Sequence, residues 1–162
     1  MNDGIRVGMA DYKICHAPQK IYTLGLGSCL GVVLYDTSTK TCGLAHVMLP
    51  DSKSISNNAN RMKFVDTCLS DMYDELINSK SIDPKNLVSK VAGGAKMFSK
   101  DSTNEFLNIG AQNYVAAVKQ LAKLRIPIIA EDVGKAFSRT IKFDPETGML
   151  LVKAVGINQY YI

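Results

Sequence analysis

The chain has 162 residues, of which 46% are hydrophobic and 21% are charged, a composition typical of one folded domain spanning residues 1–162 rather than of a disordered segment. The formal net charge is only +4 and the basic residues are scattered, so the basic stripe typical of a nucleic-acid-binding protein is missing. Aromatic residues make up 7% and tryptophan is absent, which gives no stacking platform for single strands.

The first ten residues carry charges at Asp3 and Arg6 and contain no long apolar run. We therefore expect no secretory signal, no membrane insertion and a cytoplasmic location. The four cysteines, at positions 15, 29, 42 and 68, form no Cys-x-x-Cys pair, and only two histidines accompany them. A zinc site would lack its usual paired ligands, so we expect no metal and no other cofactor. Cys15, Cys42 and Cys68 are expected to be small buried apolar residues.

The first half of the chain predicts strands joined by tight turns, over residues 5–14, 21–24, 30–35 and 42–49. A polar hairpin turn over residues 36–41 separates the last two of these strands, and a polar loop follows over 51–60. From Met62 to Leu76, apolar residues recur at spacings of three and four, which predicts an amphipathic helix of roughly 20 residues.

The second half predicts a strand over residues 87–92 that runs into Gly93 and Gly94, and then a second helix over 109–124 with Asn108 as its N-cap. The apolar face of this helix is expected to consist of Val115, Val118, Leu121 and Ala122. Further strands are predicted over residues 126–130, 140–143 and 149–155, the last of which closes the sheet. Strands lead and two helices are inserted between them, which favours an α+β layered domain.

The segment Thr23-Leu-Gly-Leu-Gly-Ser-Cys29 joins two predicted strands. Glycine permits backbone conformations that are closed to residues with a Cβ, so such a turn can point successive N–H groups into one concavity. We expect the N–H groups near Gly27 and Ser28 to form an oxyanion hole and to stabilise the Cys29 thiolate. The glycine spacing misses the Gly-x-Gly-x-x-Gly pattern and a strand follows where a dinucleotide fold needs a helix, so nucleotide binding is disfavoured.

A nucleophilic cysteine needs an imidazole within hydrogen-bond reach, and His46 is the candidate for Cys29. The hairpin turn lies about midway between them, so the two strands can place them as neighbours across the ladder. The spacing alone fits a satisfied core histidine equally well. Thr23, Asp36 and Asp51 all have the chemistry to orient the imidazole, and spacing does not choose among them.

The chain resembles the CheD family of bacterial chemotaxis proteins, the chemoreceptor glutamine deamidases, in four blocks. The blocks are Thr23-Leu-Gly-Leu-Gly-Ser-Cys29, Ala45-His-Val-Met-Leu-Pro-Asp51, Gly93-Gly-Ala-Lys-Met-Phe98 and Ile109-Gly-x-x-Asn113. They keep the order of the family and spread over most of the chain. The resemblance implies a layered α/β/β/α sandwich with mixed sheets, related to the cysteine hydrolase fold of the cytotoxic necrotizing factor toxins.

The resemblance also implies that Cys29, His46 and Thr23 form a catalytic triad, which selects Thr23 as the third member. The implied activity is that of a protein-glutamine glutaminase, which converts glutamine to glutamate on the cytoplasmic helices of methyl-accepting chemotaxis receptors through a thioester. The CheC phosphatase is an implied partner where the organism encodes it, and a non-catalytic regulator that binds CheC is the alternative function. Asp51 and Phe98 are expected to contact substrate or partner, although a phenylalanine is more often buried in the core.

Two segments depart from the family pattern. Gln112 stands where the family has an arginine, and the segment from Asp132 to Arg139 has Lys135 and Ser138 where the family has glycines. None of these positions belongs to the implied triad. We expect them to change the local backbone or a contact surface rather than the chemistry.

Overall fold

The structure is a computed structural model that describes residues 3–97 and 108–162. Its strands are β1 (Ile5–Arg6), β2 (Asp11–His16), β3 (Ile21–Leu26), β4 (Leu30–Asp36), β5 (Thr41–Val47), β6 (Leu87–Gly93), β7 (Ile128–Val133), β8 (Arg139–Asp144), β9 (Met149–Ala154) and β10 (Ile157–Tyr161). The α-helices are α1 (Val65–Asn78) and α2 (Ile109–Lys123), and short 3₁₀ helices are η1 (Ser52–Ser54), η2 (Arg61–Lys63) and η3 (Pro84–Asn86).

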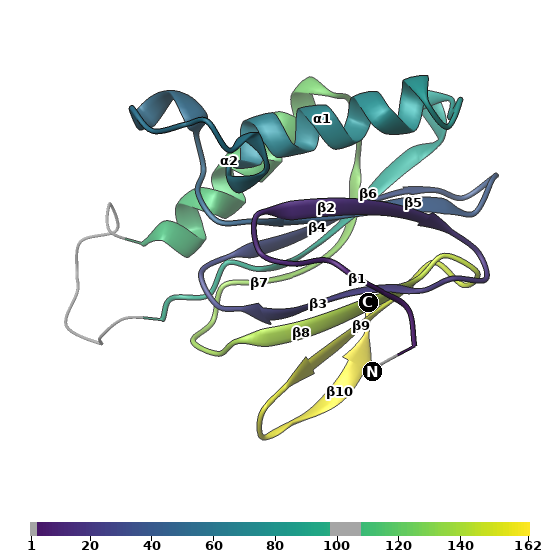
Figure 1. Cartoon of the computed structure of the whole chain (residues 1–162). Coiled ribbons are helices and arrows are strands. Elements are labelled where there is room, and N and C mark those ends of the chain that lie inside the picture. Colours follow the sequence, from purple (N-terminus) through teal and green to yellow (C-terminus); the bar gives the residue numbers. More distant parts are fainter. Residues whose placement is uncertain (1–2, 98–107) are drawn as a thin grey trace.

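The strands form two five-stranded sheets that stack face to face (Figure 1). One sheet has the order β2-β5-β4-β6-β7 and the other the order β1-β3-β8-β9-β10. Each sheet contains one parallel pair, β6 with β7 and β1 with β3, among antiparallel neighbours. The predicted α+β class with mixed sheets is therefore confirmed.

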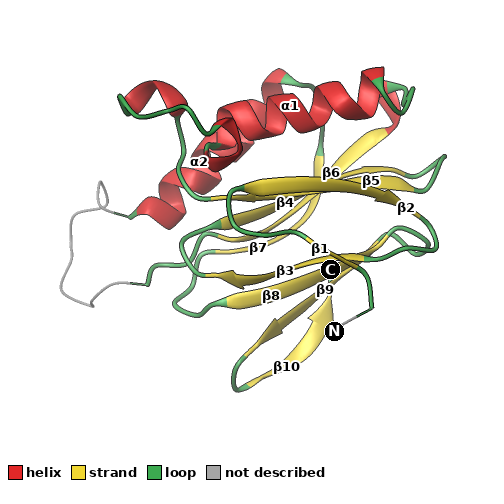
Figure 2. Cartoon of the chain, in the orientation of Figure 1, coloured by secondary structure: helices red, strands yellow, loops and turns green. Residues whose placement is uncertain are grey.

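Both helices cover the same face of the sheet that contains β5 and β4 (Figure 2). The described residues therefore form three layers, and a second helical layer, as the α/β/β/α arrangement implies, is not found among them. The outer face of the other sheet can remain in contact with solvent because its strands alternate buried and more exposed side chains. In β8, Thr140, Lys142 and Asp144 alternate with buried neighbours, the pattern of a sheet with one wet face.

The central strand β4 contributes to two apolar cores. Its residues Leu30, Val32 and Leu34 pack toward the helices, whereas Val33 and Tyr35 pack between the two sheets. Each such side chain, when fully buried, contributes about 1.5–3 kcal/mol to folding. This alternation fixes the register of β4, so the odd-numbered positions of the strand face the second sheet.

Several predicted elements differ from the observed ones. The strand predicted over residues 5–14 is broken into β1 and β2, which belong to different sheets, with Ala10 between them at a φ of 55°. The first helix has 14 residues, since its predicted first turn is the separate 3₁₀ helix η2. Strand β10, which the sequence analysis missed, rather than residues 149–155, forms the edge of its sheet. No helix in the described part of the chain is long and apolar enough to span a membrane.

The second helix has the predicted start, because the Asn108 side chain accepts a hydrogen bond from the N–H of Ala111. Its predicted apolar face is confirmed at Leu121 but is wrong at Val115, Val118 and Ala122, which are exposed. Val115 and Val118 are 52% and 38% exposed, and the buried residues are Gly110, Asn113, Ala117 and Leu121. The helix is rotated because its glycine and its asparagine both contact the segments that surround Cys29.

Candidate active site

Cys29 lies directly before β4, and His46 lies near the end of the neighbouring strand β5. The ladder pairs Gly31 with His46, so these two residues share a face. Cys29 precedes Gly31 by two residues and packs against the core between the sheets, which places its side chain on that same face. The ladder thus places Cys29 diagonally to His46 across the hairpin, with a glycine opposite the imidazole.

Thr23 reaches the imidazole from the facing sheet rather than from a neighbouring strand. Its Oγ1 lies 2.7 Å from Nδ1 of His46 and donates its own proton to the carbonyl oxygen of Val7 at 2.8 Å. A hydroxyl has one proton, so Oγ1 must accept a hydrogen bond from Nδ1–H. The two contacts together fix the neutral tautomer of His46, with its proton on Nδ1 and its lone pair on Nε2.

The Nε2 atom of His46 is buried and has no hydrogen-bond partner among the described residues. No hydrogen bond joins it to the Cys29 thiol in this structure. Burial lowers the pKa of His46 below 6.5, so the ring is neutral at pH 7. An unpaired acceptor of this kind is suited to take up a proton.

Burial also raises the pKa of the Cys29 thiol, against a smaller opposing effect of the backbone N–H of Cys29 itself, which stabilises the thiolate. We expected the turn to stabilise a thiolate, and the structure shows that desolvation is the larger of the two effects. Cys29 is therefore a neutral thiol at pH 7. It can become a nucleophile when a base takes its proton.

The turn before Cys29 has a shape that favours glycine. Gly25 has a φ of +70°, and a Cβ on Gly27 would lie 3.2 Å from Cγ of Met97. The N–H of Gly27 donates to the carbonyl oxygen of Gly25 at 3.0 Å, so this amide helps to build the turn and is not open to an oxyanion. The amides of Ser28 and Cys29 are the remaining candidates for the predicted oxyanion hole.

Asn113 holds the turn against the strand that carries His46. Its Nδ2 donates to the carbonyl oxygens of Ser28, at 2.9 Å, and of Met48, at 3.0 Å. The side chain is fully buried, and its Oδ1 has no partner among the described residues. In the sequence, Asn113 stands out only as part of a family block. A polar residue on the buried face of a helix was the signal that it has a structural role.

A second group of buried hydrogen bonds lies in the segment that departs from the family pattern. Arg139 is buried, and its Nε donates to Asp132 at 3.0 Å while its Nη1 donates to the carbonyl oxygen of Gly134 at 3.0 Å. Lys135, which replaces a family glycine, has the left-handed φ of 61° that favours glycine, and its ammonium group lies 2.8 Å from Asp132. The departure thus keeps the glycine-like backbone and adds a cation to the Asp132 carboxylate.

The remaining predicted site residues lie away from the imidazole. The carboxylate of Asp36 accepts hydrogen bonds from Ser38 and Thr39 in the hairpin turn, at the opposite end of β4. Asp51 caps η1 by accepting from the N–H of Lys53, so neither aspartate orients His46. Phe98 lies outside the described residues. Among the described residues no group of three or more His, Cys, Asp or Glu side chains is arranged to hold a metal.

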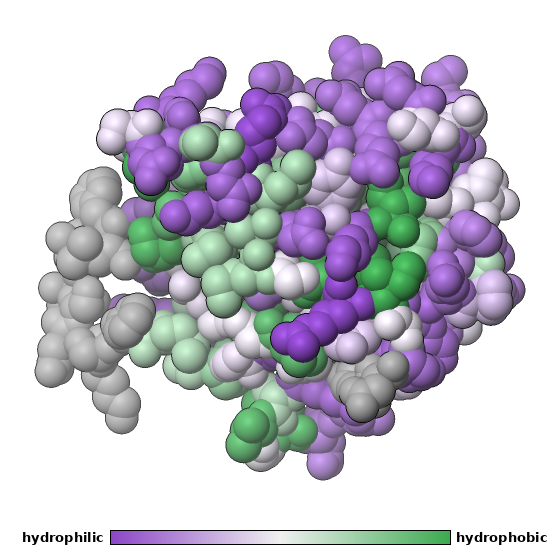
Figure 3. Space-filling model, in the orientation of Figure 1, coloured by the Kyte–Doolittle hydropathy of each residue, from purple (hydrophilic) through white to green (hydrophobic). Residues whose placement is uncertain are grey.

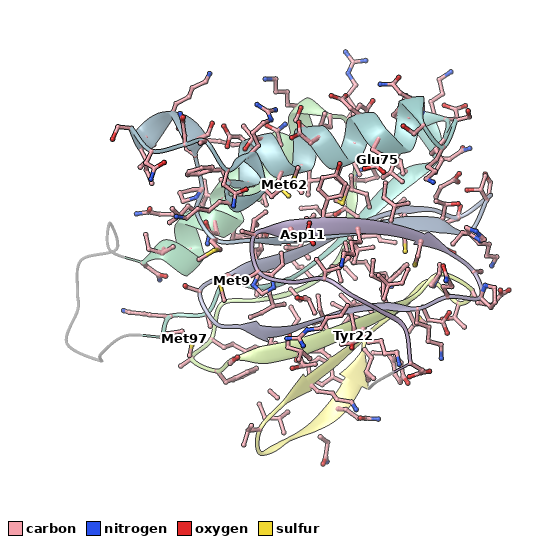
Figure 4. All side chains as sticks on the ribbon, in the orientation of Figure 1. Met9, Asp11, Tyr22, Met62, Glu75 and Met97 are labelled. Atoms are coloured by element: carbon pink, nitrogen blue, oxygen red, sulfur yellow. The ribbon has the colours of Figure 1, made fainter. Side chains whose placement is uncertain are left out.

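Three exposed apolar side chains lie on segments that contact the candidate triad or the turn before Cys29. Met9, Leu24 and Met97 are 60%, 38% and 45% exposed, and we call these three residues the apolar rim. Met9 and Met97 lie at the end of the sheets where β3 turns into β4 (Figure 4). Figure 3 shows hydrophobic surface over several parts of this face of the molecule, interspersed with hydrophilic side chains. Methionine is flexible and polarizable, so such a rim can adapt to different partners.

The chain is similar to known chemotaxis proteins. A family model described as CheD chemotactic sensory transduction matches residues 48–154, about two thirds of the chain, although the match begins after His46. The "Probable chemoreceptor glutamine deamidase CheD" of Caldanaerobacter subterraneus subsp. tengcongensis is 48% identical over 158 residues, which cover 98% of this chain and 97% of the relative. The "Chemoreceptor glutamine deamidase CheD" of Bacillus subtilis is 46% identical over 153 residues, which cover 93% and 91%.

A solved structure, that of the Bacillus licheniformis hypothetical protein YfiH, shares the fold with a TM-score of 0.52. The identity is only 13%, and the match covers 78% of this chain and 51% of the other. This likeness concerns the fold alone. The family model and the near full-length relatives show that the chain belongs to the CheD family.

Proposed function

We propose that this chain deamidates glutamine side chains of chemotaxis receptors, with Cys29 as nucleophile, His46 as general base and Thr23 as the residue that orients the imidazole. The observation that carries the proposal is the hydrogen bond from Nδ1 of His46 to Thr23, because it leaves Nε2 as an unpaired acceptor on the face that Cys29 shares. The names of the relatives supply the substrate class.

The reaction begins with proton transfer from the Cys29 thiol to Nε2 of His46, and the thiolate attacks the amide carbon of the glutamine. The tetrahedral oxyanion accepts hydrogen bonds from the amides of Ser28 and Cys29. The imidazolium then protonates the leaving nitrogen, so ammonia departs and a thioester remains. Water, deprotonated by the same imidazole, hydrolyses the thioester, which yields glutamate and restores the thiol.

Cys29 and His46 are both neutral before the reaction, so the triad must generate the thiolate and the imidazolium during it. A buried thiol and a buried imidazole each resist ionisation, so the ion pair forms transiently, as the thiolate attacks the substrate amide. Thr23 stabilises the imidazolium, because its Oγ1 already accepts from Nδ1–H. A positioned acid–base group of this kind contributes about 10²- to 10⁴-fold to the rate.

The substrate is part of a large protein, so the site must be open. The apolar rim gives a surface for the side chains that flank the reacting glutamine. Since the substrate is a cytoplasmic helix of the receptor, the proposed enzyme acts in the cytoplasm. Each reaction replaces a neutral amide by a carboxylate on that helix.

The test uses the purified cytoplasmic domain of a chemoreceptor as substrate. Wild-type protein should convert glutamine to glutamate and release ammonia, and Cys29→Ala should be inactive while it keeps its circular dichroism spectrum. Cys68→Ala is the matched control, because Cys68 is buried in α1 against the helical core. Conversion by Cys29→Ala at the wild-type rate would exclude the mechanism.

The alternative is a regulator that acts by binding the CheC phosphatase without catalysis. The exposed apolar rim favours it, since such a surface also suits a protein partner. The Cys29→Ala variant distinguishes the two functions. If Cys29→Ala retains the regulatory effect on receptor signalling in full, binding is sufficient and catalysis is not required.

A further inference from the structure

A groove lies between the loop that carries η1 and the outer face of α2, with a volume of about 780 Å³. In Figure 1 this loop projects beside α2. Val115, one of the exposed residues of the second helix, lies on the wall of this groove. This valine is 52% exposed and offers an apolar contact to a ligand that occupies the groove.

The wall that α2 contributes has the form of a helix-packing surface. Its lining residues fall in two adjacent rows with a spacing of four, and the rows are Asn108, Gln112, Ala116, Gln120 and Ala111, Val115, Lys119, Lys123. Rows of this spacing are the ridges that interdigitate when two helices pack. From position 108 to position 123 they extend about 22 Å, which is about four turns of a partner helix. Alanines in both rows allow close approach.

The charges along the groove favour an acidic occupant. Lys53, Lys119 and Lys123 line it with exposed ammonium groups, and none forms an ion pair with a residue in the described ranges. The two lining carboxylates, Asp51 and Asp66, are instead held by donors of the loop itself. The positive charges are therefore the groups left to pair with a ligand, and two of the three, Lys119 and Lys123, lie in the C-terminal half of α2.

The groove adjoins the candidate active site. Pro50 and Asp51, at one wall, follow the strand that carries His46. On the other wall, α2 is fixed to the nucleophile turn by the hydrogen bond from Asn113 to Ser28. Both walls of the groove are therefore connected to segments that carry the candidate triad.

We propose that this groove binds an acidic amphipathic helix of the chemoreceptor, the part of the substrate that extends beyond the reacting glutamine. The proposal rests on the proposed function and adds where and by what chemistry the substrate is held. Apolar residues of the receptor helix pack on Ala111 and Val115, and its carboxylates pair with Lys119 and Lys123. The site thereby selects an acidic helix rather than any exposed glutamine.

The experiment measures binding separately from catalysis. Cys29→Ala serves as the background, and its affinity for the receptor cytoplasmic domain is measured with and without Lys119→Glu plus Lys123→Glu. We expect the double reversal to weaken binding about 10- to 100-fold at low salt, with a smaller difference at high salt where surface charges are screened. The matched control is Lys85→Glu, which reverses an exposed lysine in η3 outside the groove and should leave the affinity unchanged.

The same reversal in the active enzyme should raise KM for the receptor more than it lowers kcat. Unchanged affinity and unchanged KM would overturn the groove proposal while wild-type deamidation still supports the proposed function. If instead the reversal changes the oligomeric state of the chain and not its affinity for the receptor, the groove is an interface between two copies and the proposal is wrong. If the wild type binds the receptor through these lysines without deamidating it, the proposed function fails and the groove proposal stands.

Discussion

Replacing Thr23 by valine tests the orienting role that the structure gives to its hydroxyl. Valine has nearly the shape of threonine but can neither accept from Nδ1 of His46 nor donate to the carbonyl of Val7, contacts of 2.7 and 2.8 Å in the wild type. All three residues are buried, so water does not replace the lost partners. The imidazole then loses the contact that holds its proton on Nδ1.

The expected magnitude follows from leaving a buried polar group unpaired, which costs about 1–3 kcal/mol. If this cost appears in the transition state, where the imidazolium needs the acceptor, kcat/KM falls about 5- to 150-fold. The melting temperature should fall by a few degrees, at about 2–4 °C per kcal/mol for a chain of this size.

The assay is glutamine conversion on the receptor cytoplasmic domain, measured as kcat and KM, together with thermal unfolding. Thr23→Ser is the matched control, because it keeps the hydroxyl and should retain most of the activity. A Thr23→Val enzyme with wild-type kcat/KM would refute the reasoning. So would an equal loss in the serine and valine variants, since the loss would then follow from packing rather than from the hydrogen bond.

Further predictions concern the hydrogen bonds of Asn113, the Cys29 thiol and the His46 imidazole. Asn113→Leu removes the donor to Ser28 and Met48, and it should lower the free energy of unfolding in urea by about 2–5 kcal/mol and lower kcat more than it raises KM. An unchanged kcat in a folded Asn113→Leu protein would contradict the role of Asn113 in holding the turn before Cys29. Cys29 should be the first cysteine that iodoacetamide modifies in the native protein, because the other three are buried, and the rate should keep rising as the pH passes 9 because burial raises the pKa of this thiol above 9.0. Peptide mapping of the alkylated protein checks this, and a rate that is already maximal at pH 7 would contradict it. The kcat/KM profile should fall on the acid side only below pH 6.5, since burial lowers the pKa of His46 and the neutral ring is the active form. The free energy of unfolding should also decrease as the pH falls below 6.5, because the unfolded chain then binds a proton at His46 that the folded chain still resists.

The sequence was sufficient for what depends on local pattern. The hairpin between β4 and β5 and the facing of Cys29 and His46 follow from strand alternation and from the position of the turn. The N-cap at Asn108 follows from its side chain. Burial of Cys15, Cys42 and Cys68 was also predicted and is observed.

What the sequence could not show depends on contacts between the layers. The acceptor for Nδ1 of His46 comes from the facing sheet, so spacing along one ladder had no means to choose Thr23 over Asp36. The face of α2 was assigned from its valines. In the structure a Cβ on Gly110 would lie 2.4 Å from the carbonyl oxygen of Gly94, so the helix turns its glycine and Asn113 inward.

The desolvation of the thiol is likewise a property of the folded core. Glycine spacing indicated a turn with open N–H donors, but the amide of Gly27 is used within the turn and burial raises the pKa of Cys29. The chemistry therefore depends more on His46 than the turn alone indicated.

The central claim is that Cys29 becomes covalently attached to the substrate. The most direct measurement is intact-protein and peptide mass spectrometry of wild-type enzyme that is mixed with the receptor cytoplasmic domain and quenched in acid within the first turnover. We predict a thioester adduct on Cys29, lost on treatment with hydroxylamine and absent from Cys29→Ala. Deamidation with no adduct on Cys29, or with an adduct on another cysteine, would contradict the account.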